Sequence, residues 1–137
     1  MSPKRIKFPQ ASSGSLLKTP PVFSENYDTQ TPVFSLEHMV NGYCVESCDE
    51  SQKAHFAMAL FKRRGTTWRE LKQSYRHGIG CEKIPRNQMK VAIPAKVTPD
   101  VDFLAFRCIN KAPMIGYREN RIFHILWIDK DFSVYDH

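Results

Sequence analysis

The sequence predicts an α+β fold in which a helical hairpin packs on a C-terminal antiparallel β-meander of about four strands, after an irregular N-terminal arm. Three observations predict it. Apolar runs alternate with short turns from Asp102 to His137, two helical patterns with cap signals precede them, and Pro and Ser interrupt residues 1–35. We assign residues 1–35 to a Pro/Ser-rich extended arm and residues 36–137 to a single α+β domain, a division that suits a chain of 137 residues.

The arm contains residues that block regular structure. Its Ser12-Ser13-Gly14-Ser15 run is typical of a spacer. Its prolines are Pro3, Pro9, Pro20, Pro21 and Pro32. Two similar pieces, 19–24 and 31–35, begin with Thr-Pro and end with Val-Phe-Ser, so we interpret them as apolar anchors of an extended arm that wraps its own domain or meets a partner.

The first predicted helix begins at a cap supplied by Ser47 or Asp49. It ends with the basic run 62–64 in its last turn, where cations suit the helix dipole, and with Gly65 as the stop. The helical spacing predicts a buried stripe formed by Ala54, Ala57, Leu60 and Phe61.

The second predicted helix opens with a capping box, in which Thr67 and Glu70 cap each other's backbone. One of its faces is predicted to carry Trp68, Leu71 and Tyr75, and the other Arg69, Lys72 and Arg76. Residues 81–98 are expected to form a basic loop with one short edge strand, because prolines exclude a central one.

The meander is predicted from strand-like runs at residues 103–109, 114–118, 121–128 and 132–135. The connections between these runs are short, which favours antiparallel pairing. Residues 121–128 are the most apolar run, and we expect them to be the central strand.

Positive charge is concentrated in the middle of the chain. The net charge is +6, whereas residues 53–96 alone hold eleven Lys or Arg against two Asp or Glu. Such clustering is typical of a phosphate-backbone footprint, and also of a solvated basic face or a surface for an acidic protein. The nucleic-acid-binding candidates are Lys62, Arg63, Arg69, Lys72, Arg76 and His77.

The chain has no apolar run near the ~20 residues of a membrane span, and its basic N-terminus lacks the apolar segment of a secretory signal. We therefore expect a cytoplasmic protein with no membrane partner and with thiols rather than disulfides. Cys44, Cys48 and Cys81 with nearby histidines suggest a zinc site as an alternative, but their spacing lacks the paired sets of structural zinc sites. We expect no cofactor and no metal.

No Ser-His-Asp elbow, phosphate loop or paired-carboxylate signature is present. A metal-independent ribonuclease needs a base, a cation and an acid. The cation candidates are Arg107, Arg118 and Arg121, the acid and base candidates are Tyr135, His137 and His77, and the stacking candidates are Trp68, Tyr75 and Tyr117. Each of these candidates could instead have a purely structural role. His124, which lies within an apolar strand, is typical of a hydrogen-bonded core histidine.

From about residue 45 to the Tyr135-Asp136-His137 ending, the element order resembles the RelE/ParE-like toxins of bacterial toxin–antitoxin systems. The resemblance implies a small basic endoribonuclease that cleaves messenger RNA on the ribosome without metal and has an antitoxin partner. It implies phosphate binding by Arg107 and Arg118 and acid/base roles for Tyr135 and His137. The long arm at residues 1–35 and the negative charge of Asp136 depart from the family pattern.

Two functions therefore lead, an RNA-cleaving toxin and a non-catalytic basic module that binds nucleic acid or acts as a protein inhibitor or adaptor. A metal-dependent enzyme using Cys and His is the third. The first requires Arg107, Arg118, Tyr135 and His137 to face the same side of the sheet, which alternation alone does not establish.

Overall fold

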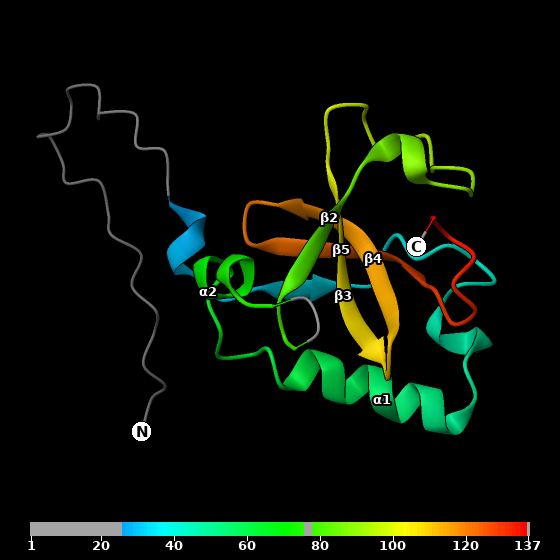
Figure 1. Cartoon of the computed structure of the whole chain (residues 1–137), viewed down its shortest axis with the longest axis horizontal. Coiled ribbons are helices and arrows are strands. Elements are labelled where there is room, and N and C mark those ends of the chain that lie inside the picture. The colour runs from blue at the N-terminus through cyan, green and yellow to red at the C-terminus, as the bar shows by residue number, and fades with distance from the viewer. Residues whose placement is uncertain (1–25, 76–77, 137) are drawn as a thin grey trace, which may run out of the picture.

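A mixed sheet organises the protein, with its strands in the order β1-β5-β4-β3-β2 (Figure 1). This computed structural model describes residues 26–75 and 78–136. The strands within that part are β1 (Val33–Ser35), β2 (Cys81–Ile84), β3 (Phe103–Ile109), β4 (Ala112–Glu119) and β5 (Ile122–Ile128). The helices are α1 (Glu50–Phe61), α2 (Trp68–Gln73) and the short 3₁₀ helices η2 (Tyr27–Thr29), η3 (Val45–Ser47) and η4 (Arg86–Gln88). An α+β architecture is thus confirmed.

Three of the four predicted meander strands are present. β3, β4 and β5 pair antiparallel through tight turns, in which Asn110 and Asn120 adopt positive φ values of 53° and 59°. β5 has a neighbour on both edges as expected, although β4 occupies the middle of the sheet. The short edge strand in the basic loop is also confirmed, because β2 pairs antiparallel with β3 and ends before Pro85.

The predicted closing strand at residues 132–135 is wrong. Those residues form a turn, and Tyr135 makes only an isolated bridge with Met89. The reason is that β5 has no vacant edge, because β1 pairs with it in parallel and Val33 lies opposite Ile122. The second Thr-Pro piece of the arm thus belongs to the sheet, whereas the first, at 19–24, lies outside the described residues.

A β-bulge shapes the pairing of β4 with β5. The register shifts between Ile115 and Gly116, so that Leu126 and Trp127 both join the hydrophobic cluster on one face of the sheet. At the bulge the strands approach closely, and a Cβ atom built on Gly116 would lie 1.9 Å from the carbonyl oxygen of His124. Only glycine fits this position.

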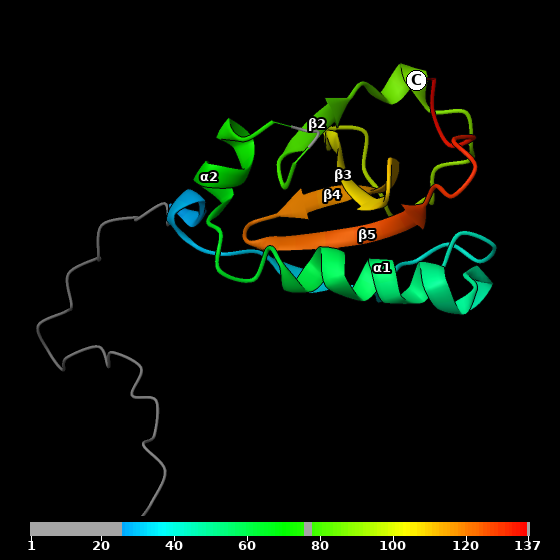
Figure 2. The same cartoon turned by 60° about the horizontal axis from the view of Figure 1, so that its bottom comes forward.

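The sheet has a different cover on each face. On the first face, α1 and α2 pack against Phe106 and Phe123. On the second face, Phe103 and Trp127 lie under the β2–β3 connection and the C-terminal segment. Figure 2 shows α1 along one side of the sheet and the C-terminal end on the other. In the described part of the chain, every helix is too short or too polar to cross a membrane.

Both helix starts agree with the sequence analysis. Asp49 caps α1 in a capping box with Gln52, and Thr67 caps α2 in the predicted box with Glu70. Trp68 and Leu71 share one face of α2 as predicted, and both are fully buried, so the Trp68 ring is not exposed for base stacking. Tyr75 is 84% exposed instead, because α2 ends at Gln73 and the chain leaves the helical path before Tyr75.

The predicted buried stripe of α1 is wrong. Phe56 and Ala59 face the sheet and are buried, with Leu60 partly buried beside them. Ala54 and Ala57 are exposed, and Phe61 is 52% exposed. The helix carries apolar residues on two opposite sides, and the side with Phe56 and Ala59 packs against the sheet.

Replacing Gly116 with alanine tests the close approach at the bulge. We expect Gly116→Ala to lower the free energy of unfolding by about 2–4 kcal/mol, because backbone must move to admit the methyl group. Gly65→Ala is the matched control, since a Cβ there meets nothing within 4 Å, and it should change stability by less than about 0.5 kcal/mol. Urea denaturation measures both, and equal effects would contradict the role of the bulge.

Candidate functional site

A pocket of about 300 Å³ opens on the second face of the sheet, between β2, the β3–β4 turn and the C-terminal segment. Two acidic and two basic side chains contribute to its wall. Its lining consists of Glu82, Gln88, Ala105, Phe106, Arg107, Lys111, Pro113, Phe132, Tyr135 and Asp136.

Strand register places the charged groups together. Glu82 lies directly opposite Ala105, so their side chains project from the same face. Arg107 follows two residues after Ala105 and projects from that face too. Lys111 joins them from the tight turn in which Asn110 has a φ of 53°. A carboxylate and two cations therefore line one pocket, although they come from distant parts of the chain.

The buried carboxylate of Asp129 positions the C-terminal wall. Its two oxygens accept hydrogen bonds from the backbone N–H of Ser133 at 2.7 Å and of Val134 at 3.1 Å. The N–H of Lys90 donates to the carbonyl of Val134 at 2.8 Å, which ties the segment to the β2–β3 connection. These bonds wind the chain into a turn and set Tyr135 against the pocket.

The pocket combines groups suited to an anionic substrate. Arg107 and Lys111 supply positive charge, and Glu82 supplies a proton acceptor. Asp136, the acidic residue that weighs against anion binding, forms an ion pair with Lys90 at 2.8 Å, which offsets its charge. Phe132 is 45% exposed at the pocket and offers an aromatic face.

The predicted catalytic residues are only partly brought together. Arg107 and Tyr135 line the pocket. Arg118 lies on the opposite face of the sheet, with its guanidinium carbon 4.4 Å from the ring centroid of Trp68. His137 lies outside the described residues. The pocket therefore contains two of the four residues.

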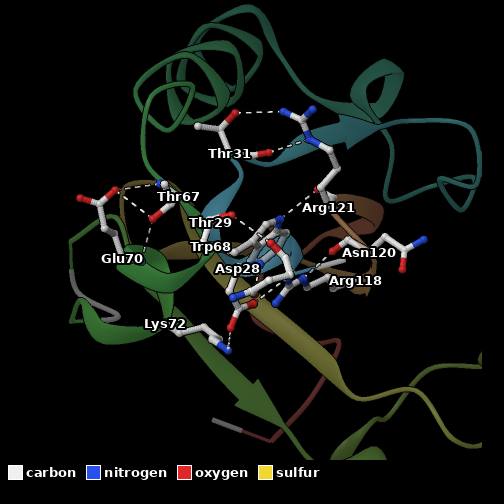
Figure 3. Close-up of polar contacts among 11 residues, drawn as sticks. Asp28, Thr29, Thr31, Thr67, Trp68, Glu70, Lys72, Arg118, Asn120 and Arg121 are labelled. Atoms are coloured by element: carbon white, nitrogen blue, oxygen red, sulfur yellow. Dashed lines mark hydrogen bonds and ion pairs between the residues drawn. The ribbon is translucent and has the colours of Figure 1, made fainter. Parts of the chain in front are cut away.

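Arg118 belongs to a polar network that holds residues 26–31 against α2 and the sheet (Figure 3). One carboxylate oxygen of Asp28 pairs with Arg118 at 2.8 Å and the other with Lys72 at 2.6 Å. The indole N–H of Trp68 donates to the carbonyl of Arg121 at 2.9 Å. Hydrogen bonds from Lys72 and Arg118 lower the pKa of Asp28 below its usual value.

Arg121 completes the network on the side of β1. Its Nε donates to the carbonyl oxygen of Thr31 at 3.0 Å and its Nη2 to the Thr31 hydroxyl at 3.1 Å. Both cation candidates outside the pocket, Arg118 and Arg121, therefore have structural partners.

The nucleic-acid-binding candidates differ in their exposure to solvent and in their partners. Lys62 and Arg69 are exposed, and Lys72 is paired with Asp28. Arg63 is fully buried, and its guanidinium donates to the backbone carbonyls of Ala59 at 2.7 Å and Ile79 at 2.9 Å. Residues 76–77, the two remaining candidates, lie outside the described part.

His124 occupies the place of a core histidine. It is buried, stacks on Tyr117 with the ring centroids 4.8 Å apart, and its Nε2 lies 2.9 Å from a carboxylate oxygen of Glu119. Within residues 26–75 and 78–136, no three His, Cys, Asp or Glu side chains are grouped so that they could hold a metal ion. The four cysteines are free, and burial raises the pKa of Cys108 to about 12.

Sequence reasoning missed Glu82, Lys111 and Phe132 as site residues. Glu82 carried a signal, since it is one of only two acidic residues in the basic segment 53–96. No protein-family model, curated protein or solved structure matches the chain.

Replacing Asp28 tests the network of Figure 3. Because the folded-state pKa of Asp28 is lowered, its stabilising effect is present above the unfolded pKa near 4 and is lost as the pH falls through the folded value. We expect Asp28→Asn to cost about 1 kcal/mol at pH 6 and progressively less below pH 4. Chemical denaturation between pH 3 and pH 7 measures this.

Asp102→Asn is the matched control for that experiment. Its carboxylate pairs with Lys83 at 3.2 Å, but both side chains are well exposed. It should cost little at any pH. Identical pH profiles for the two variants would contradict the anchoring role of Asp28.

Replacing Asp129 tests the origin of the C-terminal turn. Asp129→Ala leaves two backbone N–H groups without their acceptor, so we expect a loss of about 2–4 kcal/mol in the free energy of unfolding. Asp131→Ala removes an exposed carboxylate two residues away and should cost less than about 0.5 kcal/mol. Equal losses in thermal denaturation would show that the turn does not depend on Asp129.

Proposed function

We propose that the protein is a metal-independent endoribonuclease of the mRNA-interferase type and that the pocket on the second face of the sheet binds the RNA backbone at the cleaved bond. The observation that carries the proposal is the convergence of Glu82, Arg107 and Tyr135 on one pocket. These residue types supply the base, the cation and the acid that such cleavage needs. Lys111 adds a second cation.

The proposed reaction is an internal transesterification. Glu82 accepts the proton of the ribose 2′-hydroxyl. At the same time the 2′-oxygen of the ribose attacks phosphorus. Arg107 and Lys111 stabilise the negative charge that accumulates on the pentacoordinate phosphate. The bond from phosphorus to the 5′-oxygen breaks, and Tyr135 donates a proton to that oxygen. The products are a 2′,3′-cyclic phosphate and a 5′-hydroxyl, and exchange with water restores both protein groups.

Recognition of the substrate draws on the rim of the pocket. The ring of Phe132 is exposed there, and an unpaired base can stack on such a ring. Bases are free to do so in single-stranded RNA rather than in a duplex. The proposed substrate is therefore single-stranded RNA, either free or held on the ribosome.

The resemblance in element order to RelE/ParE-like toxins points in the same direction. It suggests messenger RNA on the ribosome as the substrate, an antitoxin protein as a partner and the cytoplasm as the place of action. It differs from the proposed site in two respects. Arg118 lies on the other face of the sheet. The resemblance also gives the second acid/base role to His137, whereas the proposal gives the role of the base to Glu82. Binding of RNA without cleavage, by exposed cations such as Lys62 and Arg69, is the competing outcome.

RNA cleavage by pocket variants tests the proposal. In the presence of EDTA, the wild-type protein should cleave single-stranded RNA, free or on ribosomes, to fragments with 2′,3′-cyclic phosphate ends. We expect Glu82→Gln and Arg107→Met to lower the rate at least about 100-fold, since general acid/base and electrostatic groups contribute on that scale. Tyr135→Phe should lower it while leaving the fold unchanged. Gel electrophoresis and mass spectrometry of the fragments measure this.

The matched control is Lys83→Met, which alters the strand residue next to Glu82. Lys83 pairs with Asp102 and is not among the residues lining the pocket, so its variant should keep the wild-type rate. RNA left intact by the wild-type protein with and without ribosomes, or cleavage that survives in Glu82→Gln and Arg107→Met, would overturn the proposal.

A further inference from the structure

Helix α1 has a second apolar side that faces away from the sheet. Phe56 and Ala59 point inward and are buried. The outward residues, spaced three and four apart, are Ala54, Ala57, Met58 and Phe61, and we call them the outer stripe. Met58 is 56% exposed and Phe61 52% exposed. In Figure 2, α1 lies at the margin of the molecule, with its outer side turned away from the sheet.

A continuous apolar stripe on a helix is normally buried against another element. Single exposed apolar residues need no explanation, but four at helical spacing form a surface of the shape that a second helix covers.

We propose that a second copy of this chain covers the outer stripe, with the two α1 helices packed antiparallel across a two-fold axis. The order of side-chain sizes supports this occupant. The small residues Ala54 and Ala57 come first along the stripe, and Met58 and Phe61 come last. With the axis between residues 57 and 58, Phe61 packs on Ala54 of the partner subunit and Met58 packs on Ala57 of the partner subunit. Each large side chain then meets a small one.

The order of charges supports the same arrangement. Glu50 lies in the first turn of α1, and Arg64 lies just beyond its C-terminus. The guanidinium carbon of Arg64 is 3.8 Å from the centroid of the Phe61 ring, and its Nη1 donates to the Phe61 carbonyl at 2.9 Å, so the cation is held at the end of the stripe. An antiparallel pair brings Glu50 beside Arg64 of the partner subunit, twice by symmetry. A parallel pair would bring like charges and like side chains together.

The contact leaves the candidate pocket open, because α1 packs on the first face of the sheet and the pocket opens on the second. The proposal therefore does not rest on the proposed function. A single pair of twelve-residue helices buries less than the roughly 800 Å² per partner of a standard interface. We expect a reversible dimer with a dissociation constant on the order of micromolar.

Sedimentation velocity of the full chain tests the proposal between about 1 and 300 μM, a range that brackets micromolar dissociation constants. The mass should rise with concentration from the 15.9 kDa of one chain toward twice that value. Glu50→Arg and Arg64→Glu, each alone, place like charges at both ends of the helix pair and should weaken association about tenfold. An equimolar mixture of the two variants should restore it, because opposite charges then face each other at both ends of the mixed pair.

The mixture separates the interface from a folding defect, since a variant with a damaged helix is not repaired by mixing. Arg69→Glu, an exposed charge reversal on α2, is the matched control and should leave association unchanged. A chain that remains monomeric up to about 300 μM, well above a micromolar dissociation constant, would overturn the proposal. So would charge reversals without effect, or a mixture as weak as its components. A stripe that binds only a different protein falls under the first of these outcomes.

Discussion

The buried guanidinium of Arg63 is the contact on which the placement of β2 depends. It donates to the carbonyl of Ala59 in α1 and to that of Ile79, just before β2, and it lies 5.1 Å from the ring centroid of Phe106 in β3. One side chain therefore joins the helix, the start of the edge strand and the sheet. Burial lowers the pKa of Arg63 to about 10, which leaves the group charged at neutral pH. Since β2 carries Glu82, this contact also supports the strand that supplies one residue of the pocket.

A buried charge also organises the opposite face. There the carboxylate of Asp129 accepts backbone N–H groups of the C-terminal turn, as Arg63 satisfies backbone carbonyls on the first face. Both charges hold irregular segments, whose backbone groups the sheet ladder cannot satisfy. Hydrogen bonds to charged groups are stronger than those between neutral groups, so each segment is fixed firmly by a single side chain. The pocket walls at β2 and at the C-terminal segment are therefore each held by a buried charged side chain.

Local signals explain what the sequence predicted well. Three strands of the meander, the caps at both helix starts and the edge strand expected within residues 81–98 all depend on patterns within about ten residues of the chain. The parallel pairing of β1 with β5 joins residues about ninety positions apart, Val33 with Ile122, and no local pattern reports it. The same limit explains the site. The residue types of Arg107 and Tyr135 marked them as candidates for the site. Their proximity to Glu82, however, depends on the register of β2 against β3 and on the turn made by Asp129. Helix α1 misled prediction because two of its sides are apolar, and periodicity cannot tell which one faces the sheet.

The distribution of charge along the sequence did not predict which cations line the pocket. Residues 53–96 hold the excess of basic residues. However, Arg63 is buried in the core, and Lys72 forms an ion pair with Asp28. The cations of the pocket, Arg107 and Lys111, come instead from residues 97–137, which hold five basic and six acidic residues. The carboxylate suited to act as a base, Glu82, comes from the basic segment. Cations matter for phosphate chemistry when they converge beside a proton acceptor in a recess, and a charge count along the chain cannot report that convergence.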